Sequence, residues 1–124
     1  MERQALEGRW TVVSAEREGQ PADDLQGNVL TIAGDRFTIA APDGRRLHGG
    51  TVRVGGAGEA TTIDFLHDEG ALRGVRWLGI HRREGDTLEI CDNAADTARP
   101  RPARFATAPE SGYVLLAFRR SPSP

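Results

Sequence analysis

Short runs of alternating apolar and polar side chains recur along the whole chain. The segment RWTVVSAERE, residues 9–18, is the first of them, with Trp10 and Val12 on one side and Thr11 and Val13 on the other. A period of two that is rich in β-branched residues favours a strand over a helix. We therefore predict that the chain begins with a β-strand.

Seven further segments have the same character and are separated by turn signals. Residues 28–54 contain three strands, divided at Gly34-Asp35 and at Pro42-Asp43-Gly44. The glycine-containing turns predict an antiparallel meander there. The other four segments are TTIDFLH (61–67), GVRWLGIHRR (74–83), DTLEICDN (86–93) and YVLLAFRR (113–120). Between the first and second strands, one short helical turn is expected over Ala22–Gln26, with Gly27 ending it.

Eight short strands without an amphipathic helix of useful length predict an all-β protein, either an eight-stranded antiparallel up-and-down barrel or a sandwich. A barrel is favoured because its closure removes exposed strand edges. A chain of 124 residues is long enough for one core, so a single domain is expected over residues 1–120, followed by a disordered tail at 121–124.

The alternation also predicts which side chains face the interior. One apolar set consists of Trp10, Val12, Leu30, Ile32, Phe37, Ile39, Ile63, Phe65, Leu88, Ile90, Leu116 and Phe118. The segment 74–83 is ambiguous, because Trp77, Gly79 and His81 share one face while Leu78 and Ile80 share the other.

Composition narrows the range of partners. Sixteen basic and eighteen acidic side chains give a formal charge of −2, which disfavours binding to nucleic acid or to an anionic membrane. No run approaches the roughly 20 apolar residues that span a bilayer, so a soluble protein is expected. The single cysteine, Cys91, and the absence of an apolar signal-length segment at the N-terminus point to the cytoplasm. The oligomeric state stays open.

The two ends of the chain carry a resemblance. Gly8-Arg9-Trp10 opens the first strand, and Arg119 and Arg120 close the last one. This arrangement resembles the signature of the calycins, the lipocalin and fatty-acid-binding superfamily. The resemblance implies that Trp10 lies across the closed end of a barrel and that one of the two arginines packs on it. A guanidinium on an indole face gains roughly 0.5–2 kcal/mol. The alternative is an ordinary core tryptophan with two exposed arginines.

A second resemblance covers nearly the whole chain. LEGRWTVVS, GDRFT, TTIDF, GIHRREGDTL and RPARF followed by LL occur in this order. They are similar to the motifs of a small bacterial lipocalin-like domain family of unknown function that is abundant in planctomycetes. The resemblance implies a lipocalin-like barrel and no particular activity. His81 stands where that family usually has tyrosine.

A barrel of this kind suggests a binding protein for a small apolar or amphipathic molecule, without a cofactor. Its mouth is expected at the loops 55–60, 92–103 and 107–112. The candidate ligand-binding residues are Phe37, Ile39, Arg53, Phe65, Trp77, His81, Ile90 and Phe118. Arg53 is included because an inward arginine is a ready clamp for a carboxylate. Gly8, Trp10, Arg119 and Arg120 are assigned structural roles.

Two other classes of function remain open. In an enzyme, His81 could act as an acid–base group with Asp64 or Asp92. Alternatively, the barrel could be an interaction module with a solid core and an exposed apolar patch. His48, His67 and His81 could meet at a metal, but their spacing is not diagnostic, and we assign no metal or catalytic residue. Cys91, with no base arranged nearby in the sequence, is interpreted as a small core residue.

Overall fold

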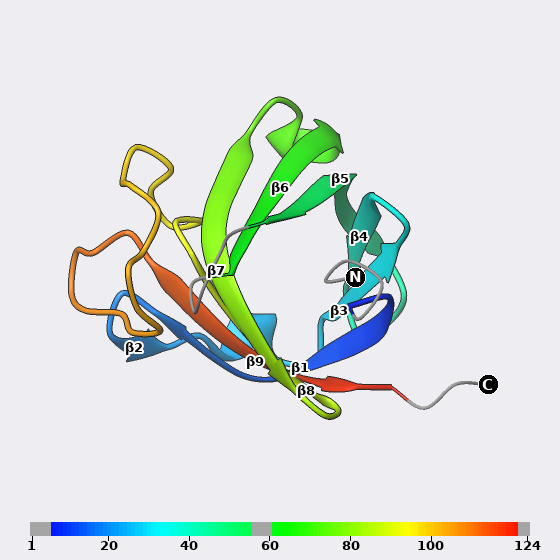
Figure 1. The fold of residues 1–124 in the computed structure, drawn as a ribbon, viewed down its shortest axis with the longest axis horizontal. Coiled ribbons are helices and arrows are strands. Elements are labelled where there is room, and N and C mark those ends of the chain that lie inside the picture. The colour runs from blue at the N-terminus through cyan, green and yellow to red at the C-terminus, as the bar shows by residue number, and fades with distance from the viewer. Residues whose placement is uncertain (1–5, 56–60, 122–124) are drawn as a thin grey trace.

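The protein is an antiparallel β-barrel (Figure 1). A computed structural model describes residues 6–55 and 61–121. Within these residues, eight strands close into an up-and-down barrel and one further two-residue strand pairs at its edge. The strands are β1 (Gly8–Arg17), β2 (Gln20–Pro21), β3 (Val29–Ala33), β4 (Arg36–Ala40), β5 (Arg46–Gly55), β6 (Thr62–Glu69), β7 (Arg76–Glu84), β8 (Thr87–Asp92) and β9 (Val114–Arg120). The predicted architecture is confirmed.

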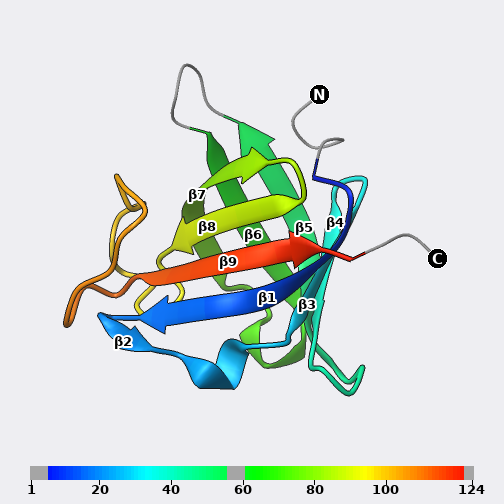
Figure 2. The same cartoon turned by 90° about the horizontal axis from the view of Figure 1, so that it is seen from below.

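The barrel closes where the first strand meets the last one. Figure 2 shows β1 and β9 side by side, and their register runs from Trp10 opposite Arg120 to Arg17 opposite Val114. The register shifts between Val12 and Ser14, which marks a β-bulge. Before the bulge β1 also pairs with β3, whereas beyond it β1 diverges from β3 and pairs with β9 and β2.

The described part of the chain has two short 3₁₀ turns, whereas the sequence predicted one helical turn. A 3₁₀ turn, η1 (Asp23–Leu25), lies inside the segment where one helical turn was expected. A second 3₁₀ turn, η2 (Gly70–Leu72), joins β6 to β7 and was not predicted, because GAL carries no capping residue or apolar period. No helix in the described part of the chain has the length and apolar character that a membrane-crossing helix requires.

The predicted inward set forms the core. All its members are buried except Ile39 and Leu116, which are partly buried and pack against the others. The ambiguity in β7 is resolved as well. Trp77 packs against the core and lies 6.2 Å from Phe65 between ring centroids, so Trp77, Gly79 and His81 share the inner face.

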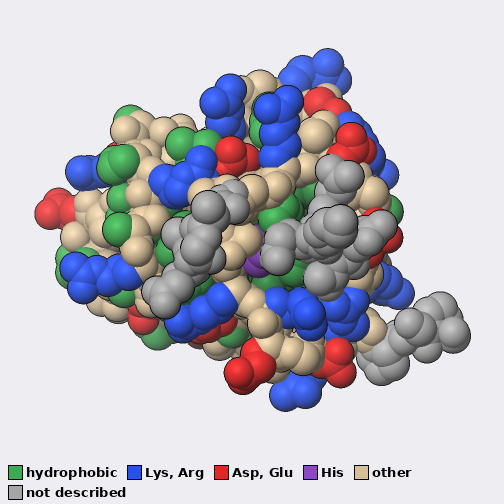
Figure 3. All heavy atoms as spheres, viewed as in Figure 1, with side chains coloured by type: hydrophobic (Ala, Val, Ile, Leu, Met, Phe, Trp, Pro, Cys, Tyr) green, Lys and Arg blue, Asp and Glu red, His purple; other side chains and the backbone are tan. Residues whose placement is uncertain are grey.

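The outer surface carries charged side chains of both signs (Figure 3). Several of them pair between neighbouring strands or turns, such as Arg36 with Asp68 at 2.6 Å and Arg46 with Glu69 at 2.7 Å. Exposed pairs of this kind contribute little stability each. The stability of the barrel therefore depends mainly on its apolar interior and on the strand pairing.

One end of the barrel is closed by Trp10. Its side chain is fully buried, and its indole Nε1 donates a hydrogen bond of 2.8 Å to the carbonyl of Leu6. The Arg120 guanidinium lies over the ring, with Cζ 4.2 Å from the ring centroid, and donates to the carbonyl of Glu7. Gly8 has φ +128°, and a Cβ there would lie 2.9 Å from Arg120 Nη1, so a side chain at this position would be strained and would crowd the guanidinium.

Only one of the two terminal arginines belongs to this closure. Arg119 is exposed and pairs in register with Thr11 and Thr87, on the opposite face of β9 from Arg120. Gly8, Trp10 and Arg120, for which structural roles were expected, thus lie together at the closed end of the barrel. Arg119 does not contribute to this closure.

Replacing Arg120 by methionine should lower the free energy of unfolding by about 1–2 kcal/mol, because the cation–π contact and the hydrogen bond to Glu7 are lost while much of the apolar stem remains. Urea denaturation measures the change. Arg119→Met is the matched control and should change stability by less than about 0.5 kcal/mol. In a double-mutant cycle with Trp10→Leu, coupling above about 0.5 kcal/mol is expected for Arg120 alone. Equal coupling for both arginines would contradict the closure described above.

Candidate functional site

A cavity of about 490 Å³ occupies the barrel interior at the end away from Trp10. Its position follows from the antiparallel topology, since Arg17 at the far end of β1, η1, the β4–β5 turn and the start of the β8–β9 connection all contribute to it. The lining residues are Val12, Arg17, Asp24, Leu25, Asn28, Leu30, Ile39, Ala41, Pro42, Arg45, Leu47, His48, Phe65, Trp77, Ile90, Asp92, Ala94, Ala95, Val114, Leu116 and Phe118. The cavity therefore has an apolar wall with a few polar groups, as small-molecule sites commonly do.

Five of the predicted ligand-binding residues line this cavity: Ile39, Phe65, Trp77, Ile90 and Phe118. Three do not. Phe37 is fully buried and packs edge-on against Phe65 at 4.9 Å, within the solid part of the core. His81 is buried on the inner face, but it is not part of the cavity lining.

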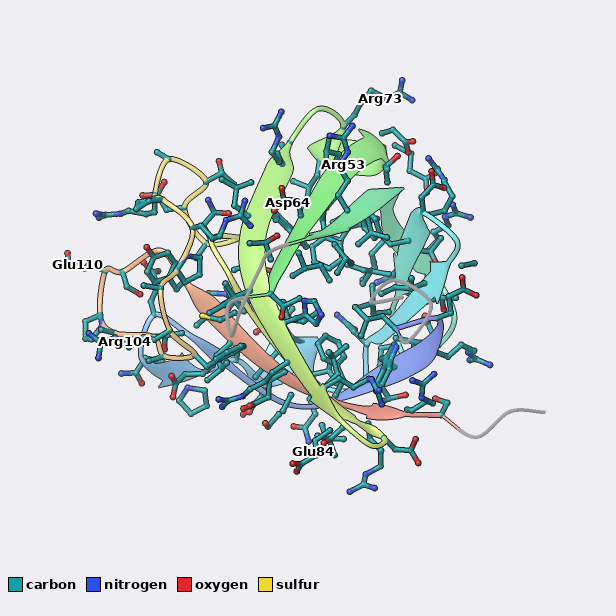
Figure 4. All side chains as sticks on the ribbon, in the orientation of Figure 1. Arg53, Asp64, Arg73, Glu84, Arg104 and Glu110 are labelled. Atoms are coloured by element: carbon teal, nitrogen blue, oxygen red, sulfur yellow. The ribbon has the colours of Figure 1, made fainter. Side chains whose placement is uncertain are left out.

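Arg53 corrects the prediction of an inward clamp. It is exposed, and Figure 4 shows its side chain on the outside of the barrel wall. Its neighbours Val52 and Val54 pack in the core, so the alternation along β5 places Arg53 outward. A carboxylate clamp by Arg53 inside the barrel is thereby excluded.

The mouth differs in part from the predicted one. Asp92, Ala94 and Ala95 come from the expected segment 92–103, but no residue of 107–112 lines the cavity. Gly55 lies at the opposite end, since β5 leads away from the mouth, and residues 56–60 fall outside the described part of the chain. The η1 turn and the β4–β5 turn form the rest of the mouth. Sequence reasoning missed them, because only the barrel topology shows which turns share an end.

Asp64 faces away from the interior. Arg101, in the β8–β9 connection, donates to Asp64 Oδ1 at 2.6 Å and to the carbonyl of Gly79 at 2.8 Å. Asp64 lies opposite Leu78, on the outer face of β6, whereas His81 is on the inner face of β7. The pairing of His81 with Asp64 as an acid–base couple is therefore wrong, and Asp64 instead anchors a loop.

The β8–β9 connection is bound to the barrel at further points. Asn93 is fully buried, accepts a hydrogen bond from the Leu78 N–H and donates to the carbonyl of Arg99. Cys91 is buried, and its thiol is within 3.7 Å of the carbonyl of Ala106. Burial raises the pKa of Cys91 to about 11, so the thiol stays protonated and unreactive near neutral pH. This agrees with its interpretation as a core residue.

Two of the three histidines meet at Trp77. The ring centroids of His67 and Trp77 are 4.3 Å apart, and those of His48 and His67 are 5.5 Å apart. Burial lowers the pKa of both imidazoles, which favours their neutral form. His67 Nδ1 lies 2.9 Å from the carbonyl of Val75 and so donates to it, which leaves Nε2 as a buried acceptor.

A three-histidine metal site is not formed. Among the described residues, no group of three or more His, Cys, Asp or Glu side chains is arranged to hold a metal ion. His67, the last residue of the predicted strand segment 61–67, is buried at 4% exposure. The histidine pair is part of an aromatic cluster in the wall instead.

Asp92 is the most unusual group in the cavity wall. Its side chain is 1% exposed, and its Oδ1 accepts a hydrogen bond of 3.0 Å from the Ala94 N–H. Burial raises the pKa of Asp92 to about 7, because desolvation disfavours the charged form. Gly79 lies opposite Asp92 on β7, and a Cβ at Gly79 would lie only 2.8 Å from the Cβ of Asp92. Glycine is therefore required here for β7 to pass the carboxyl.

Comparisons of the chain with protein-family models, with curated proteins and with solved structures found no match. The geometry of the cavity is therefore the basis for assigning a function.

Asp92 should make stability depend on pH. Its pKa rises on folding, so its folded-state proton stabilises the protein at low pH, and that stabilisation is lost as pH rises through about 7. Replacing Asp92 by asparagine should thus raise the free energy of unfolding relative to the parent by about 3 kcal/mol more at pH 8 than at pH 5.

Urea denaturation of parent and variant at both pH values measures this difference. Comparing the proteins at equal pH removes the contribution of His48 and His67, which acts in the opposite direction below about pH 6.5. Asp24→Asn at the exposed mouth serves as the control. A difference between parent and Asp92→Asn that does not vary with pH would show that Asp92 is ionised throughout.

Proposed function

We propose that the protein binds a small apolar or amphipathic molecule inside its barrel, as a lipocalin-like binding protein. The observation that carries the proposal is the cavity of about 490 Å³ with its apolar wall. Its volume falls within the range of about 300–1,000 Å³ that is usual for small-molecule sites. A core filled for stability alone leaves few voids larger than a water molecule.

The closed end supports the same proposal. Trp10 under Arg120 is the arrangement that the calycin resemblance implies, and it leaves the other end of the barrel as the route to the cavity. The order of motifs along the chain likewise supports the proposal that the protein belongs to the bacterial lipocalin-like family. Fold-level likeness alone does not define a ligand, so the cavity carries the argument.

The two alternative functions have less support. Of the two acid–base pairs considered, His81 with Asp64 is excluded, because that carboxylate is held on the outer face by Arg101. His81 with Asp92 stays a prediction, since both are buried on the inner face but His81 is not in the cavity lining. An interaction module would show a solid core and an exposed apolar patch. In the described part of the chain the barrel contains a cavity, and Val13 is the one large hydrophobic side chain that is exposed.

A matched pair of substitutions on β1 tests the binding site. Val12 lines the cavity and is 5% exposed, whereas its neighbour Val13 is 46% exposed on the outer face. Val12→Trp should weaken binding of the neutral fluorescent probe N-phenyl-1-naphthylamine by about tenfold or more, because the indole fills the space that the probe needs. Val13→Trp should bind the probe as the parent does.

Fluorescence titration measures both affinities, and native mass spectrometry of the purified parent shows any molecule that it retains. If Val12→Trp does not fold, Ile39→Trp fills the same cavity from β4. Failure of the parent to bind the probe, or an equal loss in the Val12 and Val13 variants, would show that the cavity is not a binding site.

A further inference from the structure

The charged groups of the cavity wall are not evenly distributed. Arg17 and Arg45 are the two cations in the described lining, and both lie at the mouth. Arg17 is paired there with Asp24 at 2.9 Å. The remaining charged group in the wall is Asp92, the last residue of β8, which is buried from solvent. A ligand in the cavity therefore meets one buried acid in addition to the charged groups of the mouth.

The carboxyl of Asp92 retains capacity for a ligand. The Ala94 N–H binds Oδ1, and among the described residues no hydrogen bond is shown to Oδ2. Gly79 places no side chain over the carboxyl from β7, the strand next to it. A buried carboxyl in an apolar wall is costly unless a donor or a cation satisfies it.

The surroundings of Asp92 suit an ammonium group. Trp77 is two residues from Gly79 on the same face of β7, so its indole is a diagonal neighbour of Asp92 across the strand pair. An indole face attracts a cation, most strongly where water is excluded. His67 packs against Trp77, with ring centroids 4.3 Å apart, and its Nε2 is an acceptor rather than a donor. These groups accept hydrogen bonds and stabilise positive charge.

We infer that the ligand is an amphiphilic amine, whose ammonium group binds Asp92 beside Trp77 while its alkyl chain packs toward Phe65 and Phe118. This inference rests on the proposed function and names the ligand class for that site. A fatty-acid anion would instead bring a second negative charge toward Asp92, and of the two arginines in the lining, which both lie at the mouth, Arg17 is already paired with Asp24. The structure thus selects against the acid and for the amine of equal chain length.

The titration of Asp92 gives this binding a pH dependence. With a pKa of about 7, Asp92 is about one-tenth ionised at pH 6 and about nine-tenths ionised at pH 8. An alkylammonium ion stays charged over this range, so its affinity should rise about tenfold from pH 6 to pH 8. The titratable and charged groups around Asp92 are His81 on β7, Cys91 on β8 itself, His48 on β5, Arg17 on β1 and Arg101 at the Gly79 carbonyl.

Decylamine, 1-decanol and decanoate have similar alkyl chains and different head groups, so comparing their affinities isolates the contribution of the head group. Each is titrated against the parent protein loaded with N-phenyl-1-naphthylamine, and displacement of the neutral probe gives the affinity. At pH 8 decylamine should bind about tenfold more tightly than 1-decanol, and decanoate should bind most weakly. Only decylamine should gain affinity between pH 6 and pH 8.

Asp92→Asn should lose about tenfold in affinity for decylamine at pH 8 and should lose the pH dependence, while its affinity for 1-decanol stays unchanged. Asp68→Asn removes an equal charge from the outer surface, where Asp68 pairs with Arg36 outside the cavity lining, and should retain the parent preference. If Asp92→Asn does not fold, the order of the three affinities in the parent protein and their pH dependence test the inference.

The outcomes distinguish this inference from the proposed function. Probe and 1-decanol binding without a preference for decylamine would overturn the amine inference alone. An equal loss in the Asp68 and Asp92 variants would do the same, since it would reflect general electrostatic attraction. Failure of the probe and all three decyl compounds to bind would overturn the proposed function as well.

Discussion

The pairing of β1 with β9 is the constraint on which the rest of this protein depends. It joins the two ends of the described chain into one closed hydrogen-bonded ring, so neither strand is left with an open edge. The same pairing places Trp10 opposite Arg120, and their contact plugs one end of the barrel. The bulge after Val12 then turns β1 away from β3, so that η1 rather than a strand borders the mouth.

A barrel plugged at one end has two different halves. Near Trp10, large side chains such as Phe37 and Ile63 fill the interior and are fully buried. Toward the mouth, the walls enclose space instead, between side chains that include Trp77, Ile90 and Leu116. Under the proposed function, stability and binding therefore belong to opposite ends of one core. The carboxyl of Asp92, which would be costly in the solid half, lies in the wall of this cavity.

The long β8–β9 connection links the outer wall to the mouth. Asn93 and Arg101 attach it to β7 and β6 on the outside, through Leu78, Gly79 and Asp64, while its first residues Ala94 and Ala95 line the cavity. The N–H of Ala94 also holds Asp92. The connection thus positions the buried carboxyl, which explains why a loop of this length is bound by side-chain hydrogen bonds rather than left free.

The sequence alone predicted the strands and, outside β7, their inward faces, because a period of two and tight turns are local properties of the chain. The closure by Trp10 was expected only from the calycin resemblance. The sequence could not choose between Arg119 and Arg120, or orient β7, because those choices depend on the register of strands that are distant in sequence. It also placed Phe37 and Ile39 in one class, although only Ile39 lines the cavity. Only the tertiary structure decided which turns form the mouth and whether Asp64 or Asp92 faces inward. Strand direction and pairing bring these groups together only after the barrel has closed.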